Sequence, residues 1–172
     1  MKRFNISLAL TAILATISMT SFGQTSSATA NVSATIIAPL TITKTVDMNF
    51  GNVSVSASTG GTVVLTALGV RTSTGGVSLP ITTPGTVTAA AFTVSGSGSL
   101  TYSITLPSSA TTIANGANSM TVNTFTSLPS GTGLLALGTQ TLNVGATLNV
   151  SAAQATGTYT SATPFTVTVS YN

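Results

Sequence analysis

The sequence has no cysteine, no histidine and no tryptophan, and its only acidic residue is Asp47. General acid–base catalysis needs titratable side chains beside the reacting atom, and a nucleophile needs a neighbouring base. The one formal candidate is a Ser–Lys pairing through Lys44, which no motif supports, so we expect no enzymatic activity. One carboxylate among hydroxyl groups binds a metal weakly at best, so we expect no metal and no cofactor. Because no disulfide can form, stability must come from burial and from hydrogen bonds between strands.

Charge is also scarce, since only 3% of the residues are charged. Beyond the first three residues the charged side chains are Lys44, Asp47 and Arg71. Two isolated cations cannot displace the counterions of a phosphate backbone, so nucleic acid is excluded as a partner. A net charge near zero removes the repulsion between copies and favours self-association. The apolar content of 42% argues against a disordered stalk rich in serine and threonine.

The beginning of the chain has the pattern of an export signal. Two basic residues precede an apolar stretch at 4–19, and the small residues at 21 and 23 suit a signal peptidase. We therefore expect a signal peptide at 1–23 and a single exported domain at 24–172, with a cut after Ala30 as the alternative boundary. A retained anchor is the other interpretation, but the run is shorter and more polar than a span of about 20 residues. The expected location is the periplasm, the cell surface or the medium, with no transmembrane span in the mature chain.

Apolar and hydroxyl-bearing residues alternate along most of the remaining chain, with glycine and proline between the alternating runs. A period of two is typical of strands with one buried face. We predict about eight to ten strands in an immunoglobulin-like antiparallel β-sandwich. A barrel or a β-helix is the competing architecture, although the sequence has no fixed repeat of the kind that solenoids need.

The longest alternating run covers residues 28–42 and would span about 50 Å, roughly twice the length of an ordinary strand. We expect its second half to form the first strand of the domain and residues 24–34 to be an extension. Such an extension suits addition to the sheet edge of another molecule. Val32, Ala34 and Ile36 would then be the inserting side chains. The alternative is a first strand that pairs only within its own domain.

Three further expectations concern an ion pair, a binding site at turns and the role of the aromatic residues. Asp47 and Arg71 are candidates for an ion pair across neighbouring strands, which would contribute little if it is exposed. The main alternative to an assembling subunit is a monomeric adhesion or carbohydrate-binding module that recognises glycans through the turns around Gly75, Gly98 and Gly131. The aromatic residues favour core packing over a sugar-stacking platform, because they lie in register with apolar neighbours.

Five blocks of the sequence resemble a family of bacterial secreted proteins known as domain of unknown function 4402. These blocks are residues 34–44, 47–51, 142–148, 157–160 and 165–171. The resemblance extends over essentially all of the predicted mature chain. It implies a secreted β-protein but carries no settled activity.

A more distant resemblance concerns the Asn-Phe-Gly at 49–51 and the Gly-x-Tyr at 157–159 before the last alternating run. These features are similar to spore-coat-U-like proteins and to archaic chaperone–usher pilins. That resemblance implies a sandwich that polymerises by donating an N-terminal strand to the next subunit. The chain departs from many such pilins because it has no cysteines. On the basis of the long N-terminal alternation and the nearly uncharged surface, we expect a fimbrial, coat or matrix subunit that assembles by strand pairing.

Overall fold

The computed structural model describes residues 23–172, and the chain divides into two units, Met1–Thr35 and Ile36–Asn172. Residues 23–35 of the first unit form neither strand nor helix, and all of them are exposed. The predicted signal peptide at 1–23 lies, apart from Gly23, outside the described residues.

The second unit is built from antiparallel strands, and residues 23–172 contain no helix. The strands are β1 (Thr41–Val46), β2 (Asn49–Phe50), β3 (Ser54–Val55), β4 (Gly61–Leu65), β5 (Arg71–Gly75), β6 (Val77–Ser78), β7 (Val87–Thr88), β8 (Ala90–Ser95), β9 (Thr101–Thr105), β10 (Thr111–Asn115), β11 (Asn118–Leu128), β12 (Thr132–Leu134), β13 (Thr139–Val150) and β14 (Thr168–Tyr171). The predicted all-β antiparallel sandwich is confirmed. The strands outnumber the eight to ten expected because several of them are only two or three residues long.

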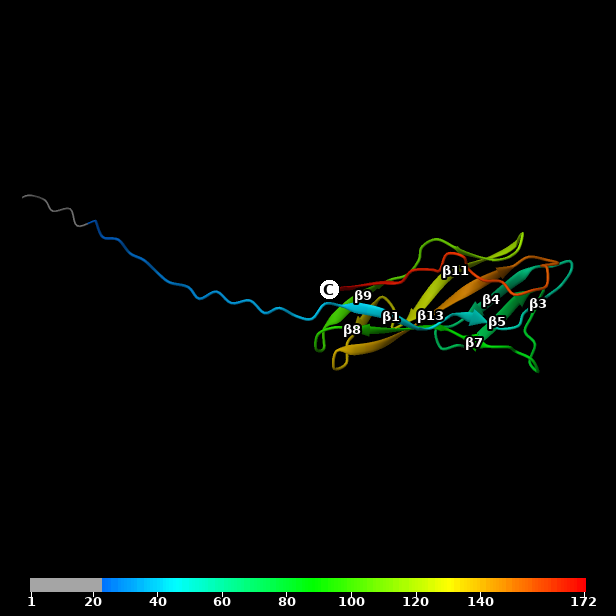
Figure 1. Ribbon diagram of the computed structural model, residues 1–172, viewed down its shortest axis with the longest axis horizontal. Helices are drawn as coiled ribbons and strands as arrows, with labels where there is room; N and C mark the ends of the chain where they lie inside the picture. Colours follow the sequence, from blue (N-terminus) through cyan, green and yellow to red (C-terminus); the bar gives the residue numbers. More distant parts are fainter. Residues whose placement is uncertain (1–22) are drawn as a thin grey trace, which may run out of the picture. The chain divides into compact units, whose positions relative to one another are not determined.

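The long strand β13 lies at the centre of the large sheet and pairs with three other strands (Figure 1). Along one edge its first half pairs with β8 and its second half pairs with β4, while β11 runs along the other edge. β1 extends the sheet beyond β8, β5 extends it beyond β4, and β10 extends it beyond β11. The inward residues of β13 alternate along its length and are all buried: Leu142, Val144, Ala146, Leu148 and Val150. The strand therefore supplies one face to two successive clusters of core residues.

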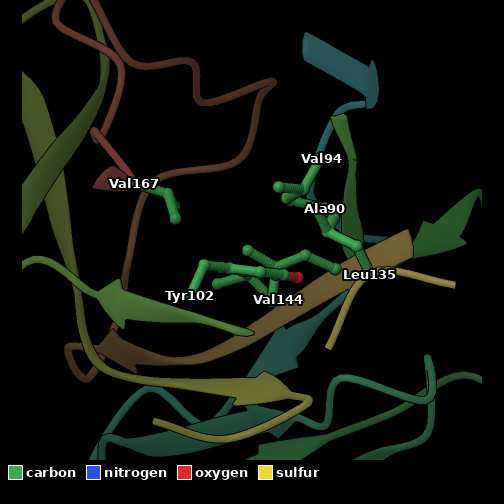
Figure 2. Close-up of a cluster of buried hydrophobic side chains, with 7 residues drawn as sticks. Ala90, Val94, Tyr102, Leu135, Val144 and Val167 are labelled. Carbon is green, nitrogen blue, oxygen red and sulfur yellow. The ribbon is translucent and has the colours of Figure 1, made fainter. Parts of the chain in front are cut away.

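The first half of β13 is covered by a second layer, the three-stranded sheet β12-β9-β14. The core between these layers contains Val94, Tyr102, Leu135, Leu142 and Val144, and Figure 2 shows side chains from several elements pointing into one shared interior. This is the closed half of the sandwich. We call this set of core residues the first cluster.

Tyr102 is 0% exposed, and its hydroxyl group donates a hydrogen bond of 2.7 Å to Oε1 of Gln140. The same oxygen accepts a bond from the backbone N–H of Leu134. Burial raises the pKa of the Tyr102 phenol, so the group stays protonated and remains a donor. The ring packs so closely on Gly133 that a β-carbon there would lie 2.2 Å from it. The buried phenol therefore fixes how the second layer sits on the large sheet.

Two sequence-based expectations are wrong. The second half of the alternating run contributes only Thr41 and Ile42 to the domain's first strand, because β1 begins at Thr41 and residues 35–40 are not in a strand. Pro39 explains this in part, since it lacks the N–H that a ladder needs. Asp47 does not pair with Arg71 either: its Oδ1 lies 2.7 Å from Nζ of Lys44, three residues away on an exposed surface.

Candidate functional site

The second half of β13 has no continuous second layer. The cluster here, which we call the second cluster, contains Val63, Val122, Ala146, Leu148 and Val150. The segments that face it are the short strands β2 and β3 and residues outside strands. Hydrophobic side chains that pack against this cluster stay only partly buried: Met48, Phe50, Val53, Val55, Ile113 and Met120. The sandwich is therefore complete at one end and open at the other.

A groove of about 980 Å³ occupies this open half. One wall comes from residues 46–55, since β3 pairs with β6, which follows directly after β5 at one edge of the large sheet. The other wall comes from residues 154–165, which are bridged to β10 at the opposite edge through Thr160 and Ala114. β11 and β13 lie between these edges, so their inward side chains form the floor. The floor of the groove is apolar, and its walls carry polar as well as apolar side chains.

The wall formed by residues 154–165 also offers backbone groups. Between the bridge at Thr160 and the start of β14 at Thr168, residues 161–167 are not in a strand. Phe165 from this segment stacks against Phe125, with ring centroids 4.9 Å apart, and closes the groove toward the first cluster. Residues 162 and 163 form a bend and Pro164 has no N–H, so a ladder with an added extended chain would be limited to residues 165–167.

Arg71 holds the opposite wall in place. Its Nη1 donates to the backbone oxygens of Phe50 and Asn52, and its Nη2 donates to that of Pro84 at 3.2 Å. Gly51 lies under the guanidinium group with a φ of +68, and a β-carbon there would lie 2.4 Å from the Pro84 oxygen. Sequence reasoning missed this role because the acceptors are backbone carbonyls, which leave no pattern in a sequence.

The three residues predicted to insert into another molecule are all exposed. Val32 is 95% exposed and Ile36 is 97% exposed, and Ala34 lies in the same exposed segment. None of the three is in a strand, and residues 23–39 are exposed throughout. The two exposed β-branched side chains, Val32 and Ile36, are costly to leave in water. Their role in strand donation remains a prediction.

Tyr171 anchors the point at which this segment joins the domain. Its hydroxyl group accepts a bond of 2.7 Å from the backbone N–H of Ser97 and donates a bond of 3.0 Å to the backbone oxygen of Ala38. Gly96 leaves room for the phenol, because a β-carbon there would lie 2.2 Å from the hydroxyl oxygen. The N-terminal segment is therefore hydrogen-bonded to the domain at Ala38, immediately before Pro39.

Replacing Tyr171 with phenylalanine should lower the free energy of unfolding by about 1–2 kcal/mol, because the Ser97 amide and the Ala38 carbonyl both lose a partner. Hydrogen exchange of the Ser97 amide should become faster at the same time. Urea unfolding and amide exchange measure the two effects. Unchanged exchange at Ser97 would contradict the anchoring role of the hydroxyl group.

The turns proposed for glycan recognition do not lie at one end of the domain. Gly75 pairs with Gly61, which pairs with Val150 at the C-terminal end of β13. The carbonyl oxygen of Gly98 accepts a bond from the N–H of Gly138, directly before the N-terminal end of the same strand. A twelve-residue strand separates the two turns by roughly 36 Å. Gly75 and Gly98 therefore do not contribute to one small binding site.

Comparison with known proteins gives one family. A family model described as Domain of unknown function (DUF4402) matches residues 40–171. No curated protein and no solved structure matches the chain. In residues 23–172, no helix is long and apolar enough to cross a membrane. No group of three histidine, cysteine, aspartate or glutamate side chains able to hold a metal ion occurs in the same range.

Proposed function

Since the chain belongs to the DUF4402 family, whose description assigns no activity, we propose a function from its own geometry. The protein is an exported structural subunit of a surface fibre, coat or matrix. Copies assemble by strand addition, in which the segment containing Val32, Ala34 and Ile36 of one copy enters the groove of the next. The observation that carries this proposal is a groove with an apolar floor at one end of an otherwise complete sandwich, in a chain that also has an exposed alternating segment.

The groove and the segment match in chemistry. Both are uncharged over most of their length, with Lys44 and Asp47 confined to one end of the groove lining. Val32 and Ile36 would each contribute roughly 1.5–3 kcal/mol on burial. Thr and Ser at the odd positions would face solvent, as in an ordinary strand with one buried face.

The two also match in length. Within residues 28–36, the six residues from 31 to 36 would extend over about 20 Å as a strand, which is close to the length of the second half of β13. A strand placed there gains apolar contacts with the floor, and it would form ladder hydrogen bonds along residues 165–167. Closing an exposed edge in this way also removes a template for uncontrolled aggregation.

The proposal predicts that substitutions at the even-numbered and at the odd-numbered positions of residues 32–36 have different effects on assembly. In the chain of residues 24–172, aspartate at Val32, Ala34 and Ile36 should abolish assembly, because carboxylates would enter an apolar groove. Aspartate at Ser33 and Thr35 should leave most of the assembly intact, since those side chains would face solvent. Sedimentation velocity and negative-stain microscopy measure the size distribution of each variant.

Deletion of residues 24–34 is the companion experiment, and it should give monomers. An oligomer distribution unchanged by this deletion would contradict the proposal. So would an equal loss of assembly in the even-position and odd-position aspartate variants, because charge alone would then explain the loss. A parent chain that is strictly monomeric and binds glycans on an array would instead support an adhesion module.

A further inference from the structure

We propose that the turn carrying Leu137 is the contact surface against which the neighbouring copy packs when a donated strand is in place. This inference rests on the proposed strand addition and extends it to a second interface between the same two copies. The turn connects β12 to β13 and is closed by the bridge between Ala136 and Thr139. The expected partner is the body of the copy whose groove holds residues 28–36.

Leu137 is unusual for its position. It is 98% exposed, and its φ of +53 is followed by a φ of +87 at Gly138. A two-residue turn with positive φ at both central residues favours Asn-Gly, because leucine is strained in the left-handed region. The residue therefore weakens the isolated domain in two ways, through its backbone and through its exposed side chain. Local strain of this kind points to a role outside the fold of one copy.

The turn lies at the end of the domain where the donated segment leaves. The register joins Thr41, the first residue of β1, to Ser95, and joins Ser95 to Thr139. Thr139 follows the turn directly and lies two strands from Thr41, or about 10 Å. The C-terminus is at this end as well (Figure 1).

Hydrogen bonds connect the exit point to the turn. Tyr171 binds the oxygen of Ala38 and the N–H of Ser97, and the neighbouring Gly96 donates to the oxygen of Gly138 at 2.8 Å. The end of the domain is thus one bonded unit that contains both the anchored chain and the exposed leucine. Movement of one relative to the other would break these bonds.

The tether between the domain and the inserted strand is short. Ile36 precedes the anchored Ala38 by two residues, which reach about 7 Å when extended. The copy that receives Ile36 must therefore lie against this end of the donor. Two other exposed leucines lie beside the turn, Leu100 and Leu134, and the N–H of Leu135 donates to the oxygen of Leu100. A repeated contact of this type is head-to-tail, and it propagates into a fibre when the rotation between copies does not close a ring.

The test uses residues 24–172 with Leu137→Asn, and with Ile81→Asn as the matched control. Ile81 is 93% exposed and lies between β6 and β7, away from this turn in the sheet order. Asparagine suits the left-handed turn, so the Leu137→Asn variant should fold at least as stably as the parent. Loss of one buried leucine from each contact should raise the concentration needed for assembly about tenfold or more, whereas Ile81→Asn should leave it unchanged.

A synthetic peptide of residues 28–37 separates this inference from the proposed function. The peptide occupies the groove without bringing a second domain, so the parent and the Leu137→Asn variant should bind it equally. Unchanged assembly of the Leu137→Asn variant beside normal peptide binding would overturn the inference alone. An equal loss of assembly in the Ile81→Asn control would also overturn it. If the parent binds no peptide and its assembly survives deletion of residues 24–34, the strand-addition proposal itself fails.

Discussion

Replacing Arg71 with alanine is expected to lower the free energy of unfolding by about 2–4 kcal/mol, because three backbone carbonyls lose charge-assisted hydrogen bonds at once. Water can replace only part of this loss, since the contact with Phe50 is partly buried. The same change should weaken assembly, because the guanidinium group holds the groove wall that carries Phe50 and Val53.

Arg71→Lys and Lys44→Ala are the controls for this prediction. Lysine keeps the charge but has no planar fork, so it should recover only part of the stability. Lys44→Ala removes a cation from the exposed pair with Asp47 and should change the free energy of unfolding by at most about 1 kcal/mol. Urea unfolding of the four proteins measures these effects. An Arg71→Ala variant as stable as the Lys44→Ala variant would show that the three contacts carry no net energy.

The alternation of apolar and hydroxyl-bearing residues was sufficient to predict the fold class. Every second residue of β13 from Leu142 to Val150 is buried, as the pattern requires. The prediction was less accurate where the alternating pattern continues but ladder partners are absent. Residues 28–36 alternate like a strand yet form none, because strand formation needs a neighbouring edge and the sequence does not say which edge is free.

The groove could not be predicted from the sequence. Met48, Phe50 and Ile113 look like ordinary core residues, and their partial burial depends on which strands fail to cover them. Arg71 shows the same limit in another way. From the sequence, the expected partner of Arg71 was a side chain of opposite charge. In the folded chain its partners are backbone carbonyl oxygens at a turn that Gly51 makes possible.

Because the chain contains no cysteine, introduced cysteines can test directly whether the exposed segment of one copy lies in the groove of another. A disulfide forms only when the two α-carbons come within about 7 Å, so it reports the position of a single residue. Cysteine introduced at Met120 places a thiol on the groove floor, where this side chain is partly buried in the second cluster. Single cysteines introduced at 32, 33, 34, 35 or 36 then sample the segment of another copy.

The decisive measurement mixes chains of residues 24–172 carrying Met120→Cys with chains carrying one of these segment cysteines, under mild oxidation, followed by a non-reducing gel. The account predicts reducible heterodimers from at least one of Val32→Cys, Ala34→Cys and Ile36→Cys, and few from Ser33→Cys or Thr35→Cys. Equal yields at odd and even positions, or no heterodimer at any of the five, would contradict strand addition into the groove.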